Sequence, residues 1–188
     1  MKTAFGVGLA GERLLIDIRE ESEADLRAVR RLNESAFGRT EEAALVDALR
    51  AAAHPQVSLV AVENREVVGH IFFSPVTIEP EADVSTKTAA ALMGLAPMAV
   101  LPQYQRQGIG SRLVREGLRE CLRMGGEAVV VLGHPEYYPR FGFVPASGKG
   151  LRCEYPVPDE VFMVTELIEG ALDGVRGLVK YHPEFGKV

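Results

Sequence analysis

A glycine-bearing loop around residues 105–111 contains the first group of residues that could do chemistry. It stands directly before a pattern typical of a helix. Gly108 and Gly110 allow close approach between the backbone and a ligand, and Ser111 adds a hydroxyl group. The first N–H groups of a helix have no partner within the helix, and the helix dipole adds a partial positive charge there. This combination favours a bound phosphate or pyrophosphate group. If the loop is considered alone, a turn that binds nothing is the alternative.

The loop does not match two common nucleotide-binding sequences. It lacks the lysine of a Walker A sequence, which argues against a nucleoside triphosphatase, and it lacks the Rossmann glycine spacing. The stretch GVGLAG at residues 6–11 has that spacing, but no strand precedes it and no clear amphipathic helix follows it. We therefore interpret residues 1–13 as a flexible leader and residues 14–188 as one domain.

A compact aromatic unit, HPEYYPRFGF at residues 134–143, carries the second candidate group. A tyrosine hydroxyl has a pKa of about 10, so it stays protonated at neutral pH and can donate a proton to a developing thiolate or oxyanion. Tyr138 follows a short apolar strand, and we expect it near the mouth of the cleft that the glycine loop forms. The alternative is that Tyr137 and Tyr138 are rim or core aromatics.

The pattern around the loop indicates the elements that position these groups. Leu92 to Leu101 is an apolar run that predicts a strand, and a helical apolar spacing then continues to Met124, where Gly125–Gly126 ends it. Residues 128–132 (AVVVL) predict a short, fully buried strand. A strand, a helix and a second strand of this kind predict a parallel crossover.

The remaining elements predict a single α/β domain with a mixed sheet, antiparallel in its first part and parallel at its centre. Ser22 and Thr40 are expected to cap two helices, which break at Gly38 and end before Pro55. The expected strands cover residues 14–19, 57–63, 67–78, 151–153 and 162–166, and residues 177–185 are expected to form an extended tail. Ser74–Pro75 is interpreted as a kink in the long third strand, and the alternative is a bulge that turns these residues toward a ligand pocket.

Length and composition limit the class of function. The chain has 188 residues, 47% of them hydrophobic, and a formal net charge of −5, which argues against a nucleic-acid-binding protein. Apolar runs are too short to cross a bilayer, so we expect no membrane partner and a cytoplasmic location. The two cysteines, Cys121 and Cys153, do not make a zinc site, and no metal is expected.

Two motifs in the right order resemble those of a known family. The stretch LAPMAVLPQYQRQGIGSRLV is similar to the acetyl-CoA signature of the GCN5-related N-acetyltransferase (GNAT) family, with Gln105, Gly108 and Gly110 at the motif positions. Tyr138, placed four residues before Gly142–Phe143, resembles the second signature. The element order fits over most of residues 14–166, and the aromatic unit is similar to that of the bacterial YhbS-type subgroup of predicted acetyltransferases.

The resemblance implies a fold, a cofactor and site residues. The strand before the loop would splay from its parallel neighbour and leave a V-shaped cleft, and Pro97, which cannot donate a ladder hydrogen bond, would sit at a bulge. Acetyl-CoA would be the co-substrate, and Tyr138 would be the general acid toward the departing CoA thiolate. The expected cofactor-binding residues are Met98, Ala99 and Val100 for the pantetheine arm, and Gln105, Arg106, Gln107, Gly108, Ile109, Gly110 and Ser111 for the pyrophosphate.

The implied reaction is direct attack of a primary amine on the acetyl thioester in a ternary complex. The acceptor would be a small-molecule amine or an amine of a peptide or protein. The alternative is a catalytically weak CoA-binding sensor or interaction module of the same fold. The C-terminal tail could pack on its own chain or cross to a partner in a homodimer.

The sequence does not identify a general base for this reaction. An amine must be neutral to attack, which at pH 7 costs about 4–5 kcal/mol for a lysine-type amine and about 1.4 kcal/mol for an α-amine. No acidic residue lies between Thr88 and Leu101. His134 could reach the cleft, although we prefer a structural role for it and for His70, and the base could be water. Three glutamates near the first helices are candidates by position only: Glu34, Glu41 and Glu42.

Overall fold

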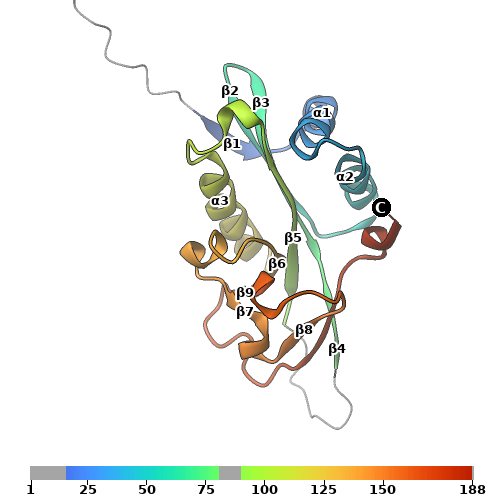
Figure 1. Cartoon of the computed structure of the whole chain (residues 1–188), viewed down its shortest axis with the longest axis vertical. Helices are drawn as coiled ribbons and strands as arrows, with labels where there is room; N and C mark the ends of the chain where they lie inside the picture. The colour runs from blue at the N-terminus through green and yellow to red at the C-terminus, as the bar shows by residue number, and fades with distance from the viewer. Residues whose placement is uncertain (1–15, 81–89, 188) are drawn as a thin grey trace, which may run out of the picture.

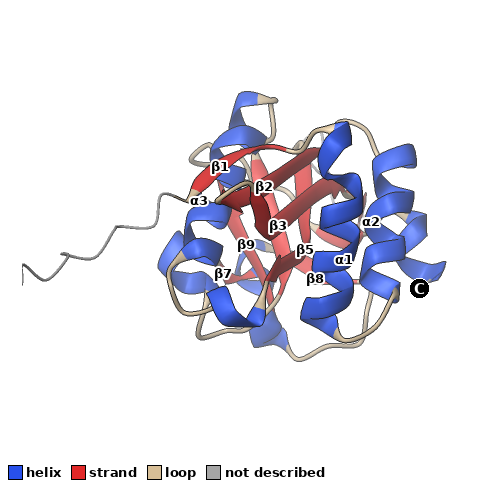
Figure 2. Cartoon of the chain, turned by 90° about the horizontal axis from the view of Figure 1, so that it is seen from above, coloured by secondary structure: helices blue, strands red, loops and turns tan. Residues whose placement is uncertain are grey.

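The computed structural model describes residues 16–80 and 90–187. Its main sheet has seven strands in the order β1-β2-β3-β5-β6-β9-β7, and helix α3 covers one face while α1 and α2 cover the other (Figure 1, Figure 2). The helices are α1 (Leu26–Phe37), α2 (Glu41–Ala52) and α3 (Ile109–Arg123). The strands of this sheet are β1 (Asp17–Glu20), β2 (Val57–Glu63), β3 (Glu66–Pro75), β5 (Leu92–Val100), β6 (Ala128–Leu132), β7 (Val144–Pro145) and β9 (Phe162–Glu166). The predicted mixed α/β architecture is confirmed.

A second, three-stranded sheet corrects two predictions. The strand predicted over residues 67–78 is wrong as a single strand: β3 ends at Pro75, and β4 (Thr77–Pro80) belongs to the sheet β4-β10-β8. Pro75 has no N–H to continue the ladder. The expected extended tail contains β10 (Gly177–Lys180), which pairs in parallel with β8 (Leu151–Cys153) and antiparallel with β4. The tail thus packs on its own chain. The GVGLAG stretch at residues 6–11 lies outside the described residues.

The central parallel pair comes apart partway along its length. β5 and β6 pair in parallel over four positions, from Leu92 with Ala128 to Leu95 with Val131, and β5 continues beyond this point. On its other side β5 stays paired with β3, with a register shift at the residues opposite Phe72. Pro97 lies inside this bulge, as the sequence predicted. The strand edge beyond Leu95 is therefore not covered by β6.

Helix α3 is fixed to the sheet by close packing. Leu113, Val114 and Cys121 are fully buried in the cluster that includes Phe73 and Leu95. At Gly117 the Phe73 ring lies so close that an added Cβ would come within 2.3 Å of it. The orientation of α3 therefore depends on a glycine in the middle of the helix.

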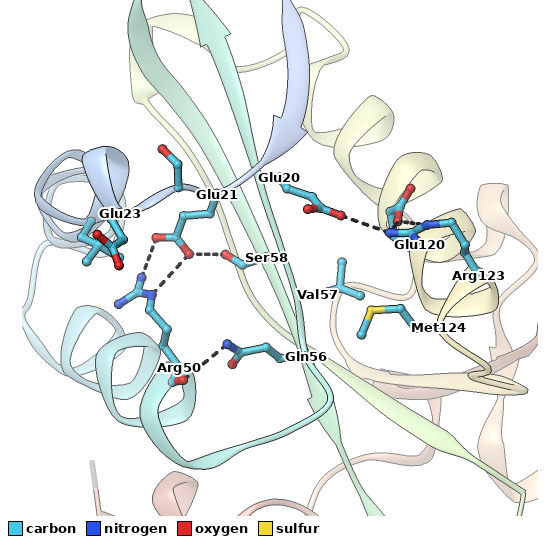
Figure 3. A pocket seen from close by; sticks show the side chains of 12 residues that line it. Glu20, Glu21, Glu23, Arg50, Gln56, Val57, Ser58, Glu120, Arg123 and Met124 are labelled. Atoms are coloured by element: carbon cyan, nitrogen blue, oxygen red, sulfur yellow. Dashed lines mark hydrogen bonds and ion pairs between the residues drawn. The ribbon is translucent and has the colours of Figure 1, made fainter.

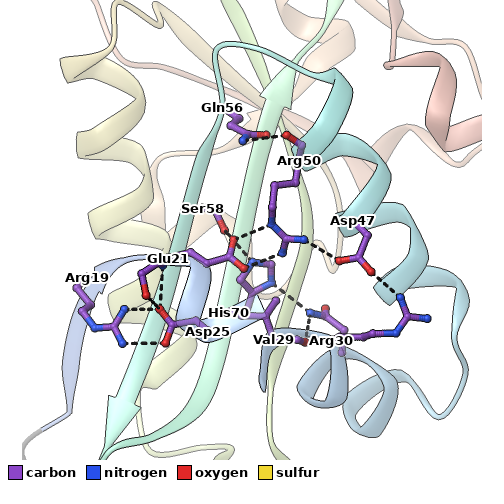
Figure 4. A network of polar contacts seen from close by, with 12 residues as sticks. Arg19, Glu21, Asp25, Val29, Arg30, Asp47, Arg50, Gln56, Ser58 and His70 are labelled. Atoms are coloured by element: carbon purple, nitrogen blue, oxygen red, sulfur yellow. Dashed lines mark hydrogen bonds and ion pairs between the residues drawn. The ribbon is translucent and has the colours of Figure 1, made fainter. Parts of the chain in front are cut away.

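A buried polar network holds α1 and α2 on the opposite face (Figure 4). The Ser58 hydroxyl lies 3.0 Å from His70 Nε2, and the Asn33 amide nitrogen lies 3.3 Å from His70 Nδ1. Since that amide nitrogen can only donate, Nδ1 is the acceptor and Nε2 carries the proton of a neutral imidazole. Ser58 in turn donates to Glu21, which accepts from Arg50 at 2.7 Å. His70 is fully buried, and its burial together with the Arg50 charge lowers its pKa to about 3.

Adding a methyl group at Gly117 should loosen α3. Gly117→Ala improves intrinsic helix propensity but overpacks the Phe73 ring, which we expect to destabilise the protein by about 1–3 kcal/mol. The free energy of unfolding from urea titration measures this. Gly148→Ala is the matched control, because an added Cβ there meets nothing within 4 Å. Equal stability of the Gly117 variant and the wild type would contradict the packing described.

The neutral state of His70 should make stability depend on pH. An unfolded histidine takes up a proton below pH about 6.5, whereas the folded pKa is about 3. Between these values the unfolded state holds the extra proton, so the free energy of unfolding should fall as the pH falls. The loss from pH 7 to pH 5 should be on the order of 2 kcal/mol. Urea titrations at both pH values should show a smaller loss in His70→Gln; an equal loss in both proteins would contradict the buried neutral imidazole.

Candidate active site

A cavity of about 650 Å³ opens where β5 runs on without β6. One wall is the uncovered edge of β5, the second is the loop and first turn of α3, and the third is the 3-10 helix η3 (Tyr138–Phe141) with the residues before it. Its lining residues are Met98, Val100, Tyr104, Gln105, Arg106, Gly108, Ile109, Gly110, Ser111, His134, Tyr137, Tyr138 and Arg140. The loop and the aromatic unit, which lie far apart in sequence, thus face one space.

The backbone of β5 offers hydrogen-bonding groups to this cavity. Leu101 donates its N–H to Val68 on β3, so by strand alternation Ala99 also directs its backbone groups to β3, while Met98 and Val100 direct theirs the other way. The Val100 carbonyl accepts a hydrogen bond from the Gln105 side chain at 3.0 Å. An extended ligand lying along this edge could therefore pair with Met98 and with the Val100 N–H.

The loop before α3 points amides and cations at the same space. Arg106 and Gly108 have positive φ values of 60° and 85°, which turn the chain sharply into the helix. The N–H groups of the first turn have no partner within the helix. Of the described residues that line the cavity, Arg106 and Arg140 are cations and none is a carboxylate. The electrostatics of the site therefore favour an anion.

Two further tyrosines shape the walls. An added Cβ at Gly110 would lie 2.9 Å from the Tyr137 hydroxyl, so the space above this glycine is occupied by Tyr137. The Arg140 guanidinium stacks over the Tyr137 ring at 4.8 Å. Tyr104 hydrogen-bonds to the buried carboxylate of Glu63, which raises the pKa of Tyr104. These contacts fix the loop to the sheet and the aromatic unit to the helix.

Tyr138 lines the cavity next to the end of β6 and is largely buried. Its ring packs edge-on against Tyr137 at 5.1 Å and against Phe143 at 5.5 Å. An added Cβ at Gly133, the residue after β6, would come within 2.1 Å of the Tyr138 ring, so the ring lies against the backbone where β6 ends. Burial raises the pKa of Tyr138 above its ordinary value, which keeps the hydroxyl protonated at neutral pH. The hydroxyl is therefore a proton donor and not a base.

Most of the residues singled out from the sequence meet in this cavity. Ala99 does not line it, because its side chain is buried, and Gln107 instead donates to the Gln103 carbonyl at 2.9 Å. Four of the lining residues were not predicted as site residues from the sequence: Tyr104, His134, Tyr137 and Arg140. His134, named there only as able to reach the cleft, does line it. Tyr137 was visible in the sequence only as a neighbour of Tyr138, since its contact with Gly110 is long-range.

The three glutamates considered as bases lie elsewhere. They belong to α1 and α2, on the opposite face of the sheet from α3 (Figure 2). Glu34 pairs with Arg30 at 3.1 Å, and Glu42 pairs with Arg39. Glu34, Glu41 and Glu42 are all missing from the residues that line the cavity.

A second cavity, of about 580 Å³, lies at the other end of α3 (Figure 3). It is bordered by several glutamates, but its two arginines are already engaged: Arg50 with Glu21 at 2.7 Å, and Arg123 with Glu120 at 2.6 Å. Ile109 and Glu120 are eleven residues apart along the helix, which corresponds to about 16 Å. This cavity is thus separate from the one that holds Tyr138.

The described residues offer neither a metal site nor a membrane-spanning helix. Within residues 16–80 and 90–187, no group of three or more His, Cys, Asp or Glu side chains could hold a metal ion. In the same part of the chain, no helix is long and apolar enough to cross a membrane.

A protein-family model and a relative from Escherichia coli both match most of this chain. A family model described as "Acetyltransferase (GNAT) domain" matches residues 17–146, which include β5, α3 and β6. The Escherichia coli K12 protein named "Uncharacterized N-acetyltransferase YhbS" is 39% identical over 171 residues, covering 90% of this chain and 98% of that protein.

Two solved structures resemble the whole fold. The crystal structure of E. coli YhbS in complex with CoA has a TM-score of 0.82 and 37% identity, over 95% of this chain and 96% of that chain. A GNAT family acetyltransferase from Brucella melitensis in complex with acetyl-CoA has a TM-score of 0.72 and 35% identity, over 92% of this chain and 99% of that chain.

Proposed function

Because the chain belongs to the GCN5-related N-acetyltransferase (GNAT) family, we propose that its 650 Å³ cavity is the site where an acetyl group passes from acetyl-CoA to a primary amine. The protein is an acyl-CoA-dependent N-acetyltransferase with acetyl-CoA as its co-substrate. The observation that carries the assignment of the site is the parting of β5 from β6 beside Tyr138 and the N-terminus of α3.

The cofactor would occupy the cavity in an extended form. Its pyrophosphate would accept hydrogen bonds from the amides at residues 106–111, with Arg106 and Arg140 adding positive charge. The pantetheine arm would pair with the backbone of Met98 and Val100. This places the thioester toward the inner end of the cavity, where β5 and β6 separate and Tyr138 lies.

Chemistry at that end requires a proton donor for the leaving group. The amine lone pair attacks the thioester carbon, a C–N bond forms, and the C–S bond breaks to release the CoA thiolate. Tyr138 would give its proton to the sulfur, which suits a hydroxyl that burial keeps protonated. None of the described residues that line the cavity is a carboxylate, so we assign removal of the amine proton to water. The acceptor is an amine of a small molecule, a peptide or a protein.

Removing the Tyr138 hydroxyl should slow turnover without loss of the cofactor. We expect Tyr138→Phe to lower kcat about 10²- to 10⁴-fold, because general acid catalysis typically contributes that much. The dissociation constant for acetyl-CoA, from calorimetry, should change little, since the ring and its packing remain. Free-thiol release measures kcat; an unchanged kcat would contradict the role of Tyr138 as the acid.

The same assay separates an enzyme from a CoA-binding module. Purified wild-type protein with acetyl-CoA should release free thiol faster when an amine is added, and mass spectrometry should find the acetylated amine. Binding of acetyl-CoA without amine-dependent thiol release, across α-amines, lysine derivatives and polyamines, would favour the binding module instead.

A further inference from the structure

Two buried hydroxyl groups have no hydrogen-bond partner among residues 16–80 and 90–187. The side chain of Ser74 is fully buried and Tyr181 is 8% exposed, yet neither Ser74 Oγ nor Tyr181 Oη meets a donor or acceptor. Buried hydroxyls without a partner are uncommon in folded proteins, because each has lost its hydrogen bonds to water without replacement. Such a pair needs a physical explanation.

Both residues lie beside Gly94 on the same face of the sheet. Ser74 is directly opposite Gly94 in the β3–β5 ladder, so its side chain and the missing side chain of Gly94 share one face. An added Cβ at Gly94 would lie 3.1 Å from Tyr181 Cε1. This is the face away from α3, since the neighbouring residues Met93 and Leu95 pack into the α3-side cluster.

Gly94 is one residue from the point where β5 and β6 separate. It pairs with Val130, and the last pair of the ladder is Leu95 with Val131. Tyr138 reaches the same point from the α3 side through its contact with Gly133. The two unpartnered hydroxyls therefore approach the expected thioester position from the opposite face.

The backbone and ring of Tyr181 make several contacts, although its hydroxyl makes no hydrogen bond to the described residues. Its backbone N–H donates to Glu154 at 2.6 Å, and its ring packs on Phe185 at 5.2 Å and near Tyr155 at 5.7 Å. The ionisable groups around it are Glu154, which also lies 3.6 Å from Lys180, together with Cys153 and Tyr155. Burial raises the pKa of Tyr181, so its hydroxyl is uncharged at neutral pH.

We propose that Ser74 and Tyr181 form the subsite that holds the acceptor amine, and that this subsite selects primary amines of low pKa that enter in the neutral form. The inference rests on the proposed acetyl transfer at the parted strands. Two uncharged hydroxyls can accept the two N–H bonds of a neutral amine, which leaves the nitrogen lone pair free for the thioester carbon. They cannot compensate the charge of a buried ammonium group.

The selection follows from the fraction of amine that is neutral. At pH 7, about one α-amine in ten is neutral, against about one lysine amine in 2,500. Glu154, the carboxylate beside Tyr181, already accepts the Tyr181 N–H and lies near Lys180, so we assign it no role as a base and the subsite draws on the neutral fraction directly. After attack, the nitrogen loses its extra proton to water, and the CoA sulfur takes the proton of Tyr138. The favoured acceptors are therefore α-amines of amino-acid amides, esters or peptides.

Steady-state kinetics with two probe amines tests the subsite. Glycinamide, with an amine pKa of about 8, should be acetylated with a higher kcat/KM at pH 7 than Nα-acetyl-lysine amide, with an amine pKa of about 10.4. Tyr181→Phe and Ser74→Ala should each raise the KM for glycinamide about 3- to 10-fold, the usual effect of one lost hydrogen bond. The KM for acetyl-CoA should not change. Tyr155→Phe, which removes a neighbouring hydroxyl, is the matched control and should keep the wild-type KM.

A stability measurement distinguishes a ligand-binding role from a structural one. Because the two hydroxyls have no partner in the free protein, Tyr181→Phe and Ser74→Ala should keep or raise the melting temperature. A lowered melting temperature with an unchanged KM for glycinamide would overturn the subsite. Preference for the lysine amine would overturn the selection for low pKa.

Binding alone tests the subsite if no amine is acetylated. A bisubstrate compound, in which the CoA sulfur carries a –CH₂–CO– bridge to glycinamide, should bind the wild type at least about 5-fold tighter than CoA, as measured by calorimetry. The linked nitrogen of this compound keeps one N–H, so at least one of the two variants should lose this gain, and both should keep their affinity for CoA. Equal affinity for the compound in all three proteins would overturn the subsite, whereas absent turnover with this gain intact would count against acetyl transfer only.

Discussion

The rest of the site depends on one interrupted hydrogen-bond ladder. β5 stays paired with β3 along its length, but it leaves β6 after Leu95, and the bulge that holds Pro97 lies just beyond that point. A strand edge that is open in the middle of a sheet has backbone groups with no partner, which is normally unfavourable. Here the open edge faces a cavity, so a ligand with amide groups of its own can complete the ladder. The unpaired backbone groups of β5 therefore remain available to a ligand in the cavity.

Aromatic side chains set against glycines bring the catalytic groups to this edge. Tyr138 lies on Gly133 at the end of β6, and Tyr181 lies on Gly94 from the other face. A side chain at either glycine would push the tyrosine away from the point where the strands separate. The proposed acid and the proposed acceptor subsite are therefore positioned by the same device, one on each face of the sheet. Gly117 does the same for Phe73, and so fixes the helix whose N-terminus we propose to receive the cofactor.

Features that depend on residues close together in the sequence could be predicted, whereas features that depend on contacts between distant segments could not. β2, β6 and α3 were readable because their apolar spacing is local, and the loop at Gly108 was readable because glycine and helix start are adjacent. The kink at Ser74–Pro75 was predicted, but the entry of β4 into a second sheet and the pairing of β10 were missed, because a three-stranded sheet of short strands gives no periodic signal of its own. The contact of Tyr137 with Gly110 and the isolation of the Ser74 hydroxyl are invisible in sequence, since they depend on how distant segments meet.

Hydrogen–deuterium exchange with and without acetyl-CoA tests the central claim most directly. If the open edge of β5 and the first turn of α3 hold the cofactor, acetyl-CoA should slow exchange at the amides of Met98, Val100 and residues 108–111. Exchange at Ala99, whose N–H is directed to β3, should change less. Protection confined to the second cavity, around Glu21 and Arg50, with no change at β5 and α3, would contradict the account.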